Sequence, residues 1–189
     1  MLVHTEDKIR TGSRVAFRQI VIVNSHRLIL RQFTPEDAPF ILSLLNDSAF
    51  LHFIGNKGVR NLDEARNYLT NGPIASYQRN GFGLYLVELK NAGTTIGMCG
   101  LLKRDALEDV DLGFAFMPDY RRQGYGFEAA SAVLSYARND LKLGDVLAIT
   151  NPDNVGSIKL LERLGFIFER TMTLSEDASE VKLFRHEPQ

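Results

Sequence analysis

A short basic run with two closely spaced glycines is the clearest chemical feature of the chain. Arg121-Arg122-Gln123-Gly124-Tyr125-Gly126 follows an apolar stretch and precedes a segment whose apolar residues recur at helical spacing. The first backbone N–H groups of a helix have no intrahelical partner and lie at the positive end of the helix dipole. Glycines at that position let the main chain close around an anion, so the run predicts a phosphate or pyrophosphate site.

The same run can equally form an ordinary turn between a strand and a helix, with two arginines in water. The residues after it favour the anion site, because they predict an amphipathic helix that begins at the glycines. The apolar stripe of this expected helix consists of Phe127, Ala130, Leu134, Ala137 and Leu141.

Composition sets the broad class of the protein. With 189 residues, of which 44% are hydrophobic and 24% charged, the chain can form one domain with a full core. We expect an extension over residues 1–26 and a single domain over residues 27–189. The net charge of -1 gives no reason to expect a nucleic-acid or membrane partner.

Cysteine usage and hydropathy point to the cytoplasm. The single cysteine, Cys99, cannot form an internal disulfide, and no apolar run reaches the ~18 residues of a membrane span. The first residues are unlike a signal peptide, so we expect a cytoplasmic protein. The four histidines lie at no metal-ligand spacing, and we expect neither a metal site nor a cysteine nucleophile.

Apolar patterns and turn signals predict an α+β fold with a mixed, mostly antiparallel sheet flanked by about four helices. Helices are expected from Thr34, from Asn61 with a break at residues 71–73, from the glycine turn, and from Asn154 to Gly165. The expected strands are residues 27–33, 82–89, 94–103, 110–117, 145–150, 166–174 and 181–184. Residues 15–17 and 20–23 can pair as an edge hairpin, cover an apolar surface or be partly disordered.

Three segments together resemble one family. Arg121-x-x-Gly124-x-Gly126 resembles the acyl-CoA signature of the GNAT superfamily of N-acetyltransferases. Asn154-x-x-Ser157 and Leu164-Gly165-Phe166 resemble the start and end of the last helix in the branch that contains the ribosomal-protein N-terminal acetyltransferases. The segments that carry the resemblance are residues 27–38, 111–130 and 151–166. The resemblance implies the GNAT acyl-CoA N-acyltransferase fold, with acetyl-CoA as co-substrate.

In similar proteins the strand before the glycine turn separates from its neighbour, and its main chain binds the pantetheine arm of the cofactor. The resemblance therefore implies main-chain roles for Phe114, Phe116 and Met117. It also implies that Asn151 and Asn154 hold the pantetheine, although Asn151 precedes a proline and can equally be a turn residue. The pyrophosphate contacts that it implies are Arg121, Arg122, Gln123, Gly124, Tyr125 and Gly126.

Two residues are candidates for proton transfer when an amine attacks the thioester. Asp111 matches an acidic position of similar proteins and is a candidate base, but it can equally pair with Arg104 or Lys103. Many GNAT enzymes carry a tyrosine acid where this chain has Leu161. Ser157 is the candidate substitute, or else simply the third residue of a helix capped by Asn154.

The acceptor is expected to be a primary amine, on either a small molecule or a protein N-terminus. An α-amino group, with a pKa of ~7.7 to 8.0, needs only a weak base, whereas a lysine with a pKa of ~10.4 needs a stronger one. Two alternative functions remain, a catalytically silent acyl-CoA-binding module and a nucleotide-binding protein, although the chain lacks both nucleotide glycine motifs. The protein can be a monomer or a homodimer. Contacts with the acceptor are expected among His52, Phe53, Arg60, Tyr77 and Tyr85. Ordinary positions on the surface for histidine and in the core for tyrosine explain these residues equally well.

Overall fold

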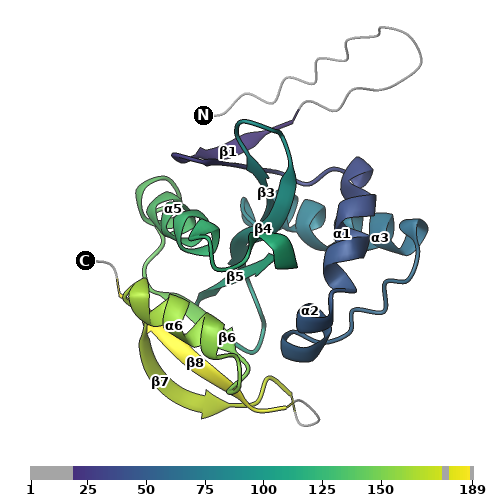
Figure 1. Cartoon of the computed structure of the whole chain (residues 1–189). Helices are drawn as coiled ribbons and strands as arrows, with labels where there is room; N and C mark the ends of the chain where they lie inside the picture. Colours follow the sequence, from purple (N-terminus) through teal and green to yellow (C-terminus); the bar gives the residue numbers. More distant parts are fainter. Residues whose placement is uncertain (1–18, 176–178, 188–189) are drawn as a thin grey trace, which may run out of the picture.

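The computed structural model describes residues 19–175 and 179–187, and its centre is one eight-stranded sheet (Figure 1). The strand order is β1-β2-β3-β4-β5-β6-β8-β7. The β5 and β6 strands are parallel, and the other neighbouring pairs are antiparallel. The strands are β1 (Val21–Asn24), β2 (Leu28–Arg31), β3 (Leu84–Leu89), β4 (Thr95–Leu102), β5 (Val110–Phe116), β6 (Val146–Thr150), β7 (Ile167–Met172) and β8 (Val181–His186).

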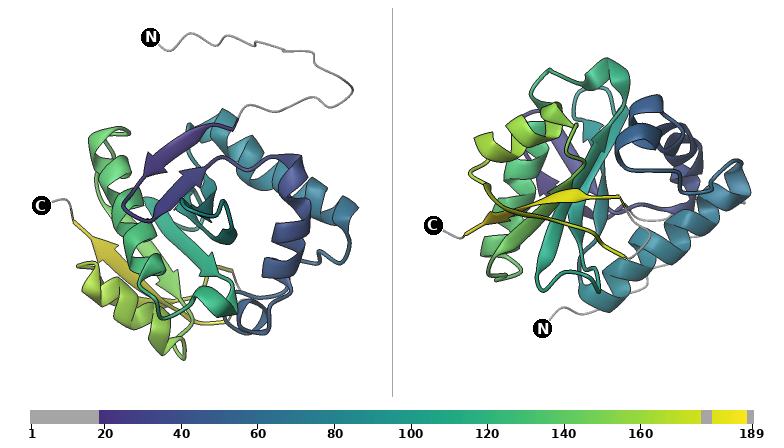
Figure 2. Two further views of the ribbon diagram at one scale, coloured as in Figure 1. Left: turned by 45° about the horizontal axis from the view of Figure 1, so that its top comes forward. Right: turned by 90° about the horizontal axis from the view of Figure 1, so that it is seen from below.

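Helices cover both faces of this sheet. One face carries α1 to α4 and the other carries α5 and α6, as the view from below shows (Figure 2). None of the helices in the described part of the chain is both long and apolar enough to span a membrane. The helices are α1 (Ala38–Leu45), α2 (Ser48–Phe53), α3 (Leu62–Leu69), α4 (Ala75–Asn80), α5 (Tyr125–Asn139) and α6 (Val155–Arg163), with shorter turns η1 (Pro35–Asp37), η2 (Thr70–Ile74) and η3 (Pro118–Tyr120).

Alternation along the strands divides the core into two layers. In β5, Leu112 and Phe116 pack in the cluster that contains the buried residues of α5, while Ala115 packs in the cluster that contains those of α1 and α3. Successive side chains of a strand point to opposite faces of the sheet, so one strand serves both layers. The sheet is therefore the common wall between the two helical layers.

The expected order of strands and helices and the mixed, mostly antiparallel sheet are confirmed. The short helix α2 was not expected. Asp47 caps it, since its Oδ1 accepts a hydrogen bond from the Phe50 N–H at 3.2 Å. The helix that starts after Asn61 does not break at residues 71–73; a π-helical turn, η2, carries it past Pro73 into α4. A π turn accommodates proline because it rearranges the backbone hydrogen bonds locally.

Two further details differ from the sequence prediction. The buried face of α5 consists of Ala129, Ala130, Val133 and Ala137, while Leu141 lies beyond the end of the helix. Three of these four buried side chains are alanines. The strand β1 pairs with β2 in an antiparallel hairpin at the edge of the sheet, whereas residues 15–17 lie outside the described part of the chain.

A buried arginine ties the start of the first helical segment to the sheet. Arg31 is only 4% exposed. Its Nε donates to Glu88 Oε1 at 2.8 Å, and its two terminal nitrogens donate to the carboxylate of Asp37, also at 2.8 Å. Asp37 in turn accepts the Thr34 N–H at 2.8 Å, which fixes the first turn. One guanidinium therefore balances two poorly solvated carboxylates.

Replacing Arg31 with alanine is expected to lower the free energy of unfolding by about 3–5 kcal/mol, because Asp37 and Glu88 lose their partner in a poorly hydrated site. Urea unfolding at neutral pH measures the change. Arg66→Ala is the matched control, because its pair with Asp63 is exposed, and it should cost no more than about 1 kcal/mol. Equal losses in the two variants would contradict this assignment.

Candidate active site

The parallel strands β5 and β6 separate soon after they meet. They are paired at Val110 with Val146 and at Asp111 with Leu147. On its other side, β5 stays paired with β4 as far as Phe116. The edge of β5 that faces β6 is therefore open after Asp111, as the resemblance implied for the strand before the glycine turn.

The hydrogen-bond phase of β5 fixes which main-chain groups face this opening. The Met117 N–H donates to the Ile96 carbonyl at 2.9 Å, so residue 117 faces β4. Residues of an antiparallel ladder alternate in direction, so the N–H and C=O groups of Phe114 and Phe116 point away from β4, toward the opening. The Met117 carbonyl accepts the Tyr120 N–H at 3.0 Å. The main chain of Met117 is therefore already engaged, in contrast to the role expected for it.

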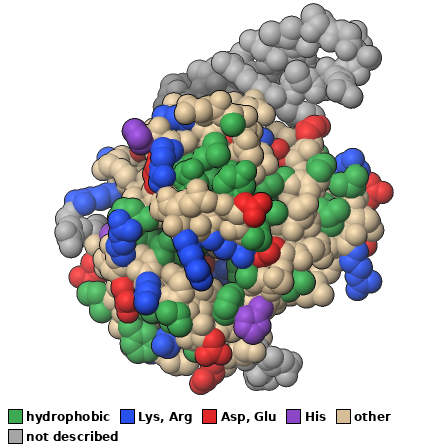
Figure 3. Space-filling model, viewed as in Figure 1, with side chains coloured by type: hydrophobic (Ala, Val, Ile, Leu, Met, Phe, Trp, Pro, Cys, Tyr) green, Lys and Arg blue, Asp and Glu red, His purple; other side chains and the backbone are tan. Residues whose placement is uncertain are grey.

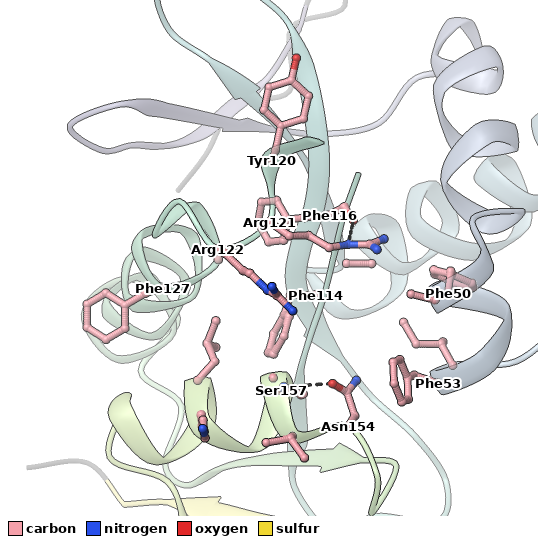
Figure 4. Close-up of a pocket in the computed structure, with 18 of the residues that line it drawn as sticks. Phe50, Phe53, Phe114, Phe116, Tyr120, Arg121, Arg122, Phe127, Asn154 and Ser157 are labelled. Atoms are coloured by element: carbon pink, nitrogen blue, oxygen red, sulfur yellow. Dashed lines mark hydrogen bonds between the residues drawn. The ribbon is translucent and has the colours of Figure 1, made fainter. Parts of the chain in front are cut away.

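A cavity of about 750 Å³ occupies the opening (Figure 4). Its walls come from β5, from the turn before α5, from the starts of α5 and α6, and from the segment around α2. In the space-filling view, Lys and Arg side chains gather around a hollow on this face, with hydrophobic side chains beside them (Figure 3). The expected site residues that line it are Phe114, Phe116, Arg121, Arg122, Gly124, Gly126, Asn154 and Ser157.

The glycine turn leaves the start of α5 open. Gly124 is the N-cap residue, with a φ of 82°, and no side chain caps the helix. An added side chain is strained at such a φ, which accounts for glycine there. A Cβ atom on Gly126 would come within 3.0 Å of Leu160 Cδ1, so this glycine lets α6 approach the first turn of α5. The exposed N–H groups of α5 can therefore receive an anion from the cavity.

The turn between β1 and β2 is hydrogen-bonded to the glycine turn and to the first turn of α5. Glu128, in the first turn of α5, accepts hydrogen bonds from Arg27 Nε at 2.7 Å, from the Arg27 N–H at 2.7 Å and from Ser25 Oγ at 2.8 Å. Arg27 also donates to the Gln123 carbonyl at 3.1 Å, and its guanidinium lies 4.4 Å from the centre of the Tyr125 ring. Gln123 and Tyr125 are thus engaged with Arg27 and do not line the cavity.

Hydrogen bonding to Arg27 and Ser25 determines the ionisation of Glu128. Partial burial raises the pKa of this carboxyl, but the hydrogen bonds that it accepts from Arg27 and Ser25 outweigh burial and lower the pKa below its ordinary value of 4.5. The carboxylate is therefore the stable form in the folded protein.

The two arginines of the turn take different directions (Figure 4). Arg121 Nε donates to the Phe116 carbonyl at 2.8 Å, and its terminal Nη2 pairs with Asp47, the cap of α2. The pKa of Asp47 is lowered, because the bonds from Arg121 and from the Phe50 N–H outweigh the effect of burial. Arg122 is exposed and points into the cavity. Arg121 thus connects the turn to α2, while Arg122 offers its charge to the cavity.

The start of α6 brings an amide and a hydroxyl to the cavity. Asn154 Oδ1 accepts the Ser157 N–H at 3.0 Å, which caps the helix, and both residues line the cavity (Figure 4). Asn151 Oδ1 accepts the Asp153 N–H at 2.8 Å in the preceding turn and lies outside the lining. The geometry of Asn151 therefore matches its interpretation as a turn residue.

Asp111 lies beside the opening but does not line the cavity. It is 1% exposed, and its two carboxylate oxygens accept Arg104 Nε at 2.9 and 3.1 Å. Burial raises the pKa of Asp111, and Arg104 opposes this effect. This geometry favours the ion-pair alternative over direct contact with an attacking amine.

Among the expected acceptor contacts, Phe53 lines the cavity and His52 is exposed outside it. Tyr77 and Tyr85 belong to the core, with stacked rings whose centres lie 5.5 Å apart. Arg60 is exposed, and its N–H donates to Glu64. Within residues 19–175 and 179–187, no group of three or more His, Cys, Asp or Glu side chains is arranged to hold a metal ion.

Comparison with known proteins gives one consistent family. Residues 27–167 match the acetyltransferase (GNAT) domain. An uncharacterized N-acetyltransferase, YoaA of Bacillus subtilis, is 26% identical over 147 residues, which is 77% of this chain and 82% of that protein.

Solved structures with the same fold include RimL, the ribosomal L7/L12 α-N-protein acetyltransferase, in complex with coenzyme A. Its TM-score is 0.75 at 20% identity, and the match covers 88% of this chain and 97% of that one. A Salmonella typhimurium acetyltransferase that modifies the N-terminal serine of L7/L12 has a TM-score of 0.73 at 19% identity, with 91% and 100% covered. These similarities confirm the fold.

The Glu128 contacts predict a specific pH dependence of stability. Because the pKa of Glu128 is lowered in the folded protein, the ionised carboxylate stabilises the fold fully at pH values above its ordinary pKa of 4.5. This stabilisation is lost as the pH falls through the folded-state pKa. Glu128→Gln should lower the free energy of unfolding at neutral pH by about 1–3 kcal/mol. The difference from wild type should shrink as the pH falls below 4.5.

Urea unfolding over that pH range measures both effects. Glu162→Gln, on the exposed surface of α6, is the control and should follow the wild type. A gap between wild type and Glu128→Gln that stays constant with pH would refute the contribution of the ionised carboxylate.

Proposed function

Because the chain belongs to the GNAT acetyltransferase family, we propose that it transfers the acetyl group of acetyl-CoA to a primary amine. One observation supports this most strongly: the open edge of β5 and the uncapped start of α5 line the same cavity. An extended thioester cofactor needs hydrogen-bonding groups along its arm and a positive site for its pyrophosphate. The cavity offers both, next to each other.

The cofactor would lie with its pyrophosphate at the turn between Arg122 and Gly126. The N–H groups at the start of α5 and the Arg122 guanidinium would bind the phosphate oxygens. The pantetheine arm would follow β5, where Phe114 presents its N–H and C=O groups and Phe116 its N–H to the opening, since the Phe116 carbonyl is bonded to Arg121. The Asn154 amide would contact the same arm. Support for this arrangement comes from the RimL structure, which shares the fold and was solved with coenzyme A.

Acetyl-CoA would supply an activated acetyl group, so the protein needs no nucleophile of its own. As the amine nitrogen bonds to the carbonyl carbon and the C–S bond breaks, the Phe114 N–H would stabilise the negative oxygen. The Ser157 hydroxyl would give a proton to the departing sulfur and regain one from solvent. The proton of the amine would pass to water, because Asp111 is engaged with Arg104.

The acceptor class rests on the chemistry of the amine and on the fold. A protein N-terminus or another α-amine is partly neutral at pH 7 and needs no strong base. The proteins that share the fold include enzymes named for acetylating the N-terminus of L7/L12. We therefore favour an α-amine on a peptide or a small molecule.

Acetyl-CoA should raise the melting temperature of the protein, by an amount equivalent to about 2.7 kcal/mol at a concentration 100-fold above its dissociation constant. Arg122→Glu should abolish most of this shift, since it places a negative charge beside the phosphates. Arg138→Glu, at the other end of α5, is the control and should keep it. No shift in wild type, or an equal shift with ATP, would rule out this cofactor assignment.

Ser157→Ala tests the proton donor. It should reduce kcat by about 100-fold while leaving the acetyl-CoA thermal shift intact, because a general acid acts in the chemical step. Release of free thiol from acetyl-CoA in the presence of an amine measures kcat. Ser43→Ala, on the exposed surface of α1, is the control. An unchanged kcat would exclude Ser157 as the proton donor and leave it only a structural role in the first turn of α6.

A further inference from the structure

The half of the cavity beside α2 has apolar walls. Phe50 and Phe53 line it from α2 (Figure 4). Ile54, directly after α2, and Val155, at the start of α6, also line the cavity. Two of these residues are exposed to solvent, Ile54 by 44% and Val155 by 57%. Exposed apolar side chains that line one cavity are typical of a ligand site rather than of a core.

Charged side chains gather in the other half. Arg122 belongs to the turn before α5, while Lys159 and Arg163 belong to α6. Arg163 also covers the Phe127 ring at 4.2 Å. The phosphate groups of the proposed cofactor account for positive charge in this half.

Carboxylates are scarce throughout the cavity. Within the described part of the chain, Asp153 is the one acidic residue that lines it, against four basic ones. Asp47, beside α2, is already paired with Arg121, and Asp111 with Arg104. A polyamine or an aminoglycoside carries several positive charges, and each would lose water here without gaining a carboxylate partner.

We infer that the acceptor is an amine carried on an uncharged apolar group, and that Phe53 and Ile54 select it. The assignment rests on the proposed acetyl transfer and specifies its substrate class. Contact with an aliphatic or aromatic group removes apolar surface from water on both sides, which favours binding. An α-amine on such a group also reaches the thioester in its neutral form without a carboxylate nearby.

The first test compares small amines by free-thiol release from acetyl-CoA. Leucinamide and phenylalaninamide should exceed glycinamide in kcat/KM by at least about 10-fold, because a hydrophobic pocket discriminates by about that factor or more for each missing methylene. Spermidine should be the poorest acceptor. Preference for glycinamide or spermidine would overturn the assignment.

Short peptides that begin with Leu or Gly extend the same series. The Leu peptide should again be the better acceptor, whatever the source of the amine. A higher kcat/KM for the Leu peptides than for leucinamide would identify a polypeptide N-terminus as the source of the amine. An equal or higher kcat/KM for leucinamide would identify a small amine. A Gly peptide that is the better acceptor would count against the apolar selection.

Phe53→Glu tests the wall directly. It should lower kcat/KM for leucinamide by at least about 10-fold and raise it for spermidine, because it exchanges apolar contact for a carboxylate. The thermal shift with acetyl-CoA should remain, which shows that the variant is folded and binds the cofactor. Leu51→Glu is the matched control, since Leu51 lies on the same helix, is 38% exposed and does not line the cavity.

Failure of the acceptor assignment can be told apart from failure of the proposed transfer. If Phe53→Glu keeps the wild-type order of amines, the selection by this wall is wrong while acetyl transfer stands. If acetyl-CoA stabilises the protein but no amine releases thiol, the transfer itself is refuted, and the acceptor assignment falls with it.

Discussion

The early separation of β5 from β6 is the constraint on which the rest of the site depends. The two strands are parallel, so α5 must cross over between them, and their pairing extends over only two positions in each strand. Beyond Asp111 the strands part, and the main-chain groups of Phe114 and Phe116 remain without a neighbouring strand on that side. The starts of α5 and α6 meet at this opening, where they form one cavity with α2.

Ion pairs hold two of the elements around that opening, α5 and α2. Glu128 connects the first turn of α5 to Arg27 in the hairpin, and Arg121 connects the glycine turn to Asp47. Because Asp47 also caps α2, the glycine turn and the apolar wall share one contact. Both arginines of the motif line the cavity, but Arg121 is engaged with the Phe116 carbonyl and Asp47, whereas Arg122 is exposed.

Local patterns predicted most of the fold and part of the site. Helix starts, glycine turns and strand alternation depend on nearby residues, so the element order, the open turn and the Asn154–Ser157 cap were all visible in the sequence. The Arg27–Glu128 and Arg121–Asp47 pairs join residues 101 and 74 positions apart, and no local signal reveals them. The helix α2 has only six residues, too few for a clear period, and the engagement of Met117 depends on the phase of the β4–β5 ladder.

The central claim is that acetyl-CoA binds along the open edge of β5 with its pyrophosphate at the start of α5. Titration of ¹⁵N-labelled protein with acetyl-CoA, followed through the backbone amide resonances, tests it most directly. The amides of Phe114, Gly124 and Gly126 should shift together and saturably, while that of Leu101, which donates to the Gly83 carbonyl inside the sheet, should stay in place. Saturable shifts confined to another surface, or none at all, would contradict the account.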